Sequence, residues 1–357
     1  MNTSNSKLLN FSQCPIYVGL DVHKKSWSVT LFSDEFELKT FTQPPKPDVL
    51  VNYLNQHYPG AQFKAIYEAG FSGFWVQREL SKLGICCEII HPADVPTSDK
   101  EKRQKTDKMD SRKLSRVCKS KDARGIYIPT EEQQEERNLL RVRQKIIRDT
   151  TRVKNRIKFY LMYQGIDTSF FEGRKWTRKY ISLLKEIELV TPSGTFALQT
   201  YIEELDNLEK QSSKLDLGVR ELSKTDSYRE NVELLCSVPS IGITSAMIIL
   251  TEIGEITRFK TFDDLCSFFG LIPNTHSSGD NERVGHMTRR GNQFLKSIII
   301  ECAWTAVRKD PALLQYYKEL TVRMNGNKAI IRIARRLLSR IRHVLMKKEK
   351  YQIGILK

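Results

Sequence analysis

Short, mostly apolar runs bounded by polar turns, prolines and glycines mark the first part of the chain, a pattern typical of buried strands. Between them lie stretches whose apolar residues have helical spacing. The order βββαβαβα indicates an α/β layer around a mixed sheet. The expected strands are 16–22, 26–32, 36–42, 62–67 and 85–90, and the expected helices are 47–57, 74–83 and 107–121.

The pattern changes after residue 131, where apolar residues recur three or four positions apart up to about residue 225. This period predicts a long antiparallel helical hairpin or coiled coil, interrupted near Gly165 and at 191–194. A mostly helical block with two Gly-rich interruptions follows over 230–310. A final helix over 326–350 has an apolar side made of Ile330, Ile333, Ala334, Leu337 and Ile341.

These patterns divide the chain into three expected domains. Residues 1–125 form the α/β domain, 126–228 a helical coiled-coil spacer and 229–357 a helical C-terminal domain. The fold class is therefore α/β plus all-α.

The composition adds a strong positive charge. The 357 residues include 58 Lys and Arg against 42 Asp and Glu, a net charge of +16. Three stretches hold the excess, because 100–124, 137–158 and 323–350 carry net charges of +7, +8 and +9 while the remainder is net acidic. Concentrated basic stretches indicate surfaces that bind an acidic polymer, of which nucleic acid is the commonest. On the helix over 137–158, nine basic residues face one acid, so we expect the counter-charge to come from a partner.

Other classes are disfavoured. The polar N-terminus shows no signal peptide, and no apolar run approaches the ~18 residues of a membrane span. The seven cysteines form no CxxC pair and no zinc-ligand spacing. We therefore expect a cytoplasmic protein with reduced thiols and no membrane partner.

Four acidic residues stand where a solvated side chain is not expected. Asp21 lies in an apolar strand, and Glu68 ends another. Asp107 and Asp110 begin a helix on the stripe that continues through Leu114, the face that packs inward. Four carboxylates converging at a sheet edge suit one or two Mg²⁺ ions, with Mn²⁺ as the alternative. The plainer alternatives are that the helix dipole favours the two first-turn acids and that Asp21 merely ends its strand.

The residues around these acids resemble a known family. The stretches 17–24 (YVGLDVHK), 67–70 (YEAG) and 105–110 (KTDKMD) are similar to the DEDD motif of insertion-sequence transposases. That family has an N-terminal RuvC-like domain of the ribonuclease H fold, is related to the Piv-type DNA invertases and includes bridge-RNA-guided recombinases. The resemblance implies that Asp21, Glu68, Asp107 and Asp110 are metal ligands.

The resemblance continues in the second half. Residues 235–246 are similar to the Pro-Gly-Ile-Gly segment of a helix-hairpin-helix-like element, with Ser240 where the family has its first glycine. Such a turn presents backbone N–H groups that can hold a phosphate, although an ordinary helix joint has the same pattern. Residues 328–338 resemble the family's C-terminal end.

Residues 269–292 resemble the second signature of the family, in which the serine before a glycine is the recombinase nucleophile. That position is Ser278, and Ser277 is the alternative. Taken alone, the two serines indicate only a loop. Arg283, Arg289 and Arg290 follow closely and suit phosphate oxygens. His276 and His286 are candidates for the base, a role that the sequence leaves open.

The resemblance implies a transposase of an insertion sequence, acting at the nucleoid. It would recombine DNA through a covalent phosphoserine intermediate with Mg²⁺ assistance, guided by an element-encoded bridge RNA. A composite site would join the RuvC-like domain and the serine domain across protomers of a dimer or tetramer, with the spacer helices as the assembly device. The alternatives are a Piv-like invertase that needs no RNA, a metal-dependent junction nuclease that uses water, and a non-catalytic nucleic-acid-binding protein.

Overall fold

A computed structural model describes residues 11–12, 14–96, 106–167, 175–278, 281–288 and 290–353, without the side chains of 275–278, 281–284 and 286. The chain divides into two compact units, residues 1–128 and 129–357. The second boundary that we predict, at 228/229, stays a prediction. Across the described residues, no helix is both long and apolar enough to cross a membrane.

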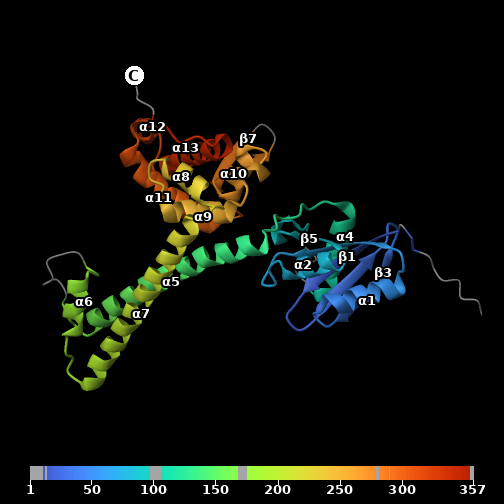
Figure 1. The fold of residues 1–357 in the computed structure, drawn as a ribbon, viewed down its shortest axis with the longest axis horizontal. Coiled ribbons are helices and arrows are strands. Elements are labelled where there is room, and N and C mark those ends of the chain that lie inside the picture. The colour runs from blue at the N-terminus through green and yellow to red at the C-terminus, as the bar shows by residue number, and fades with distance from the viewer. Residues whose placement is uncertain are drawn as a thin grey trace, which may run out of the picture. The chain divides into compact units, whose positions relative to one another are not determined.

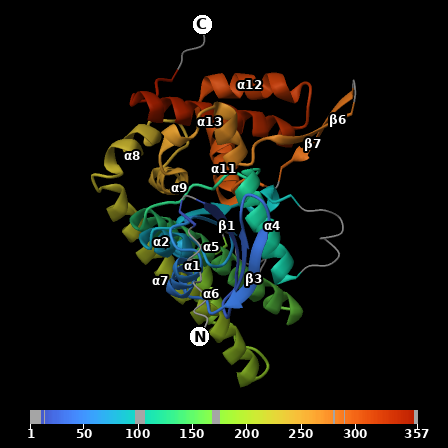
Figure 2. The same cartoon turned by 90° about the vertical axis from the view of Figure 1, so that its right-hand side faces the viewer.

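A five-stranded mixed sheet forms the centre of the first unit (Figures 1 and 2). Its order is β3-β2-β1-β4-β5, with antiparallel pairs on one side of β1 and parallel pairs on the other. The strands are β1 (Pro15–Val22), β2 (Trp27–Phe32), β3 (Glu37–Gln43), β4 (Gln62–Glu68) and β5 (Cys86–Ile90). The helices are α1 (Pro47–His57), α2 (Trp75–Lys82), η1 (Pro92–Asp94) and α4 (Asp107–Ser120). The expected βββαβαβα order is confirmed.

Helices cover both faces of this sheet (Figure 2). Leu20, Val29 and Leu31 point to one face and form a core with residues of α1 and α2, including Leu54 and Leu80. Ile66 and Ile90 point to the other face and pack with Leu114 and Val117 of α4. Because successive side chains alternate between faces, β1 presents Gly19 and Asp21 to the α4 side.

The second unit begins with two long helices, α5 (Glu131–Tyr163) and α7 (Pro192–Ser223). Ion pairs join Arg143 to Asp216 and Arg156 to Glu204, so residue numbers fall along one helix as they rise along the other. The predicted antiparallel hairpin is thereby confirmed. A short helix that the sequence pattern did not predict, α6 (Arg178–Lys185), packs Tyr180 and Leu184 against the far end of this pair.

The C-terminal block packs around one apolar core, which Leu140 of α5 and Val219 of α7 also join. Helices α9 and α13 supply many of its residues, including the five predicted for the apolar side of the last helix. The elements are α8 (Arg229–Cys236), α9 (Ile243–Ile253), η2 (Ile256–Arg258), α10 (Phe262–Phe268), β6 (Pro273–Ser278), β7 (Asn281–Met287), α11 (Gln293–Lys309), α12 (Pro311–Thr321) and α13 (Gly326–Lys347).

Candidate functional site

Close packing of α4 on β1 positions the first group of candidate residues. A side chain at Gly19 would place its Cβ 2.1 Å from the Ser111 oxygen and 2.3 Å from the Ser115 nitrogen, so only glycine fits. Thr30 of β2 also reaches α4, where its Oγ1 lies 2.8 Å from Ser111 Oγ. These contacts bring the first turn of α4 to the end of β1 at which Asp21 stands.

Three side chains meet at this edge of the sheet. His23 Nε2 lies 3.1 Å from Asp21 Oδ2 and 3.7 Å from Asp107 Oδ1. One ligand atom from each of Asp21, His23 and Asp107 lies within 4.8 Å of the other two. Burial raises the pKa of the Asp21 carboxyl, His23 opposes that rise, and the charges of Asp107 and Asp110 add to it. The group is therefore acidic, partly buried and under mutual repulsion.

The other two predicted acids, Asp110 and Glu68, lie near this group but are not among the three residues whose ligand atoms lie within 4.8 Å of one another. Asp110 acts on the pKa of Asp21 and pairs with Lys113, whose Nζ lies 3.5 Å from its Oδ1. Glu68 follows Tyr67, which pairs with Leu20, so Glu68 comes level with Asp21 on the neighbouring parallel strand. It shares the α4 face with Ile66.

The prediction that both first-turn acids face inward is correct for Asp110 and wrong for Asp107. The side chain of Asp110 is 17% exposed, whereas that of Asp107 is 68% exposed. Asp107 is the first residue of α4, directly after the capping Thr106, whose hydroxyl accepts a bond from the Met109 N–H. At that position the helix has not yet reached the sheet, so the periodicity that holds from Asp110 onward does not bury Asp107.

His23 was missed as a site residue because the sequence pattern placed it in a polar turn. Its place two residues after Asp21 was the available signal, since positions two apart along an extended chain share a face. The imidazole lies between two carboxylates, where it offsets part of their negative charge when it is protonated.

The donor set fits a divalent cation. Carboxylate oxygens are the ligands that Mg²⁺ and Mn²⁺ prefer, and Asp21 and Asp107 provide them with Asp110 close by. Ser28, directly opposite Asp21 on β2, buries a hydroxyl that has no hydrogen-bond partner among the described residues. A buried polar atom of that kind beside a carboxylate suits a hydrated ion.

The second candidate group lies on a β-hairpin, where the sequence pattern indicated a loop. Strands β6 and β7 pair with Ser277 opposite Glu282 and Ser278 opposite Asn281. Ser278 is thus the last paired residue of β6. The side chains of Ser277, Ser278, His276, Arg283 and His286 lie outside the described part of the chain, as does the whole of Arg289. Arg290 is described and exposed.

The hairpin was overlooked because both strands are polar and lack an alternating apolar pattern. The turn itself carried a signal, since Gly-Asp between two strand-length segments favours a two-residue hairpin turn. The hairpin returns close to its starting point, where a Cβ on Gly291 would lie 2.2 Å from the Gly270 Cα.

A buried carboxylate anchors the chain just after the hairpin. Glu252 of α9 is 2% exposed and accepts two hydrogen bonds from Arg141, at 2.7 and 2.9 Å. Arg137 lies 3.9 Å from it, and Asn292 donates its amide N–H to Glu252 at 2.9 Å. Asn292 also caps α11. This network connects α5, α9 and the start of α11 within the second unit.

Replacing Glu252 with alanine is expected to lower the free energy of unfolding by about 3 kcal/mol, because the two arginines lose the carboxylate that balances them. Glu204→Ala is the control, since its pair with Arg156 is exposed and is expected to contribute less than about 1 kcal/mol. Urea denaturation of both variants measures the difference. Equal losses would contradict the role given to Glu252.

The turn between α8 and α9 forms although a serine replaces the glycine of the family pattern. Ser240 adopts φ +83°, a left-handed conformation that favours glycine. Its hydroxyl is buried without a hydrogen-bond partner among the described residues. The turn thus keeps its path at the cost of local strain.

Replacing Ser240 with glycine is therefore expected to stabilise the protein by about 1 kcal/mol, because the strain and the unpaired hydroxyl both disappear. Thermal denaturation provides the measurement. Ser240→Ala is the control: it removes the hydroxyl but keeps a Cβ at positive φ, so its gain should be smaller. An equal gain for alanine would show that the backbone is not strained there.

The counter-charges of the second basic stretch come largely from the chain itself. On α5, Arg143 and Lys154 pair with acids of α7, and Arg141 pairs with Glu252. The expectation that this stretch needs a partner's charge is therefore wrong for these residues. The acids that neutralise it lie far away in sequence, so a local count of charges did not include them.

Comparison with known proteins gives matches over both units. Residues 18–163 match the family model of DEDD transposases of the IS110 type, described as "Transposase", and residues 232–318 match the "Transposase IS116/IS110/IS902 family". Together they span more than half of the chain.

Individual relatives also match. The transposase for insertion sequence element IS1533 of Leptospira borgpetersenii is 24% identical over 326 residues, 88% of this chain and 91% of that protein. The transposase for element IS1111A of Coxiella burnetii is 25% identical over 289 residues, 80% of this chain and 78% of that protein. For y4qE of Sinorhizobium fredii, 25% identity extends over 67% of this chain but only 57% of that protein.

Proposed function

The chain belongs to the DEDD transposase family of insertion sequences, and from this premise we propose that it cuts and rejoins DNA through a covalent phosphoserine intermediate. The observation that carries the proposal is the meeting of Asp21, His23 and Asp107 at one sheet edge, with Asp110 close by. A divalent-cation site of this kind, on a mixed sheet matched by the DEDD family, suits phosphodiester chemistry.

In this proposal, Asp21, Asp107 and Asp110 of the first unit hold the cation, and Glu68 completes the set from the next strand. A bound Mg²⁺ would offset the negative charge of the scissile phosphate and of the oxygen that leaves it. His23 orients Asp21 and Asp107 through its two close contacts. The first unit is accordingly assigned a RuvC-like role.

Ser278 of the second unit is the nucleophile. Its hydroxyl loses a proton as the oxygen bonds to phosphorus, the bond from phosphorus to one deoxyribose oxygen breaks, and that oxygen takes up a proton, so the step is balanced. Attack by the hydroxyl of the exchanged strand then restores a phosphodiester and releases Ser278. Because one phosphoester replaces another at each step, no nucleotide cofactor is required.

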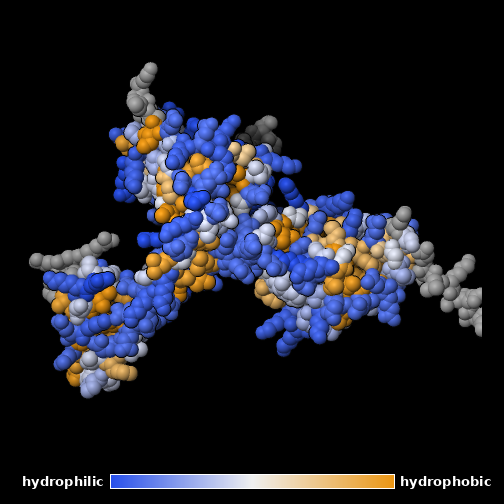
Figure 3. All heavy atoms as spheres, viewed as in Figure 1, coloured by the Kyte–Doolittle hydropathy of each residue, from blue (hydrophilic) through white to orange (hydrophobic). Residues whose placement is uncertain are grey.

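The proposal includes a guide RNA and a homo-oligomer. The exposed side chains of Phe159 and Met162 on α5, with Phe196 and Leu217 on α7, support assembly through the helical pair. Figure 3 shows apolar patches among the hydrophilic surface of that pair. Exposed apolar side chains of this kind often mark interfaces.

The test is recombination of labelled donor and target DNA by the purified full-length chain in Mg²⁺, with and without ribonuclease treatment. Joined product that disappears after ribonuclease supports the whole proposal. Joined product that survives ribonuclease favours an RNA-independent invertase. Cut ends without joining would contradict the recombinase and favour a nuclease that uses water.

A further inference from the structure

A groove of about 1170 Å³ lies between the β6–β7 hairpin and the basic helix α13. The hairpin contributes Pro273, Gly285 and Met287 to its lining, while α13 contributes several basic residues. Pockets for small ligands commonly measure roughly 300–1,000 Å³, so the groove has room for more than a single phosphate.

Three cations on one face of α13 line this groove without an acidic partner. Lys328, Arg332 and Arg336 stand four residues apart, so they lie along one side of the helix. Within the described part of the chain, no carboxylate pairs with any of them. Arg336 instead lies over the ring of Tyr316, 5.3 Å from its centroid.

Neighbouring arginines on the same helix show the contrast. Arg335 pairs with Asp263 at 3.1 Å and donates to the Leu271 oxygen. Arg340 pairs with the buried Asp310 at 2.6 Å. Arg335 also lines the groove, but its charge is balanced by Asp263, whereas Lys328, Arg332 and Arg336 make no such pair among the described residues and leave their charge available to an anionic ligand.

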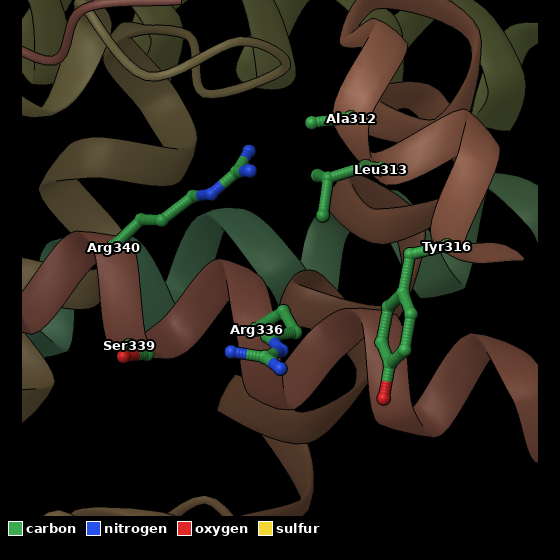
Figure 4. A pocket seen from close by; sticks show the side chains of 6 residues that line it. All are labelled: Ala312, Leu313, Tyr316, Arg336, Ser339 and Arg340. Atoms are coloured by element: carbon green, nitrogen blue, oxygen red, sulfur yellow. The ribbon is translucent and has the colours of Figure 1, made fainter. Parts of the chain in front are cut away.

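The remaining wall of the groove is mostly apolar and aromatic, with Asn327 and Ser339 as its other polar side chains. Phe262, Met287 and Met324 line it, and Tyr316 borders both the groove and an adjoining pocket. Figure 4 shows the side chains of Arg336 and Tyr316 reaching into that pocket from α13 and α12. Aromatic, methionine and arginine surfaces accept the flat face of a base, while cations hold its phosphate. A nucleotide combines these two chemistries.

We propose that this groove holds unpaired nucleotides of the DNA strand that Ser278 cuts. Strand β6 runs from Pro273 in the groove wall to Ser278, five residues at ~3.3 Å each, or about 17 Å. At ~3.4 Å per nucleotide of one strand, the occupied segment begins within about five nucleotides of the attacked phosphate. That the bound strand is the one that Ser278 cuts rests on the proposed function. That the groove binds single-stranded DNA does not depend on it.

Binding of a short fluorescent single-stranded DNA to the full-length chain, measured by anisotropy in EDTA at several salt concentrations, tests the groove. Arg332→Ala combined with Arg336→Ala is expected to weaken binding about tenfold or more and to lower the salt slope by ~0.7 per cation removed. Lys328→Ala removes one cation and should lower the salt slope by ~0.7. Its control is Lys347→Ala, an exposed lysine on the same helix outside the groove, which should change neither quantity.

Two further arms complete the experiment. A 2-aminopurine base in the strand should change its fluorescence on binding, and Met287→Ala should reduce that change. An RNA of the same sequence should bind more weakly; tighter binding of RNA would overturn the assignment to the cut strand. Equal affinities and salt slopes for Lys328→Ala and Lys347→Ala would contradict the groove as the binding site. Because no cleavage occurs in EDTA, a failure of the serine chemistry leaves these results unchanged and is detected separately.

Discussion

Replacing Ser278 with alanine is expected to abolish DNA recombination, with product formation falling by at least about 10³-fold. The reason is chemical, since the variant has no hydroxyl to form the bond to phosphorus. Binding of DNA should change little, because the basic residues of α13 and the fold of the block are untouched. Ser278 is the last paired residue of β6, and its replacement keeps the backbone groups that pair with β7.

Quantifying joined product over time for the wild type, Ser278→Ala and Ser277→Ala provides the measurement. Ser277→Ala is the matched control, because it removes the same group one residue earlier on the same strand. Wild-type rates in Ser278→Ala, or loss of activity only in Ser277→Ala, would contradict the assignment of the nucleophile.

Replacing Asp21 with asparagine is expected to reduce DNA cleavage by roughly 10³-fold as well, since the amide cannot supply the negative oxygen that a divalent cation needs. The same change should not destabilise the protein in the absence of metal. The pKa of Asp21 is raised by burial, so the ionised carboxylate costs stability in the folded state.

The pH dependence of stability follows from the direction of that pKa shift. A raised pKa in the folded state gives a contribution that is fully present below the unfolded value, about 4, and is lost as the pH rises through the folded value. In EDTA, the wild type should therefore lose stability relative to Asp21→Asn as the pH rises from about 4 toward neutrality. Mg²⁺ should raise the Tm of the wild type and not that of the variant.

Activity assays and thermal denaturation of both proteins, with Asp48→Asn as the control, measure these effects. Asp48 is an acid of the same unit that lies outside the candidate site, in the first turn of α1, and it is exposed. Full cleavage activity in Asp21→Asn, or an equal Mg²⁺ response in all three proteins, would contradict the cation site.

The fold of the first unit could be predicted from the sequence because its apolar runs match the two faces of one sheet. The spacing of apolar residues did not predict the structure where a strand is polar, where a helix is short or where a helix ends. Strands β6 and β7 are polar, and the short helix α6 follows a stretch with little pattern of its own. Asp107 lies at a helix end, where spacing alone does not decide whether a side chain is buried.

Long-range pairing explains the remaining differences at the candidate site. His23 joins Asp21 and Asp107 only because α4 folds across β1, a contact that Gly19 makes possible. Likewise, the acids of α7 and α9 that balance α5 lie at least 48 residues away in the chain. Local sequence patterns contain the candidate residues but not these contacts.

The proposed recombination depends on a covalent bond between DNA and Ser278. Denaturing electrophoresis of the full-length chain with labelled DNA and Mg²⁺, followed by mass spectrometry of the digested adduct, tests it most directly. We expect a protein–DNA band that is absent in Ser278→Ala and a phosphorylated peptide whose modified residue is Ser278. Cut DNA without any adduct, or an adduct on another residue, would contradict it.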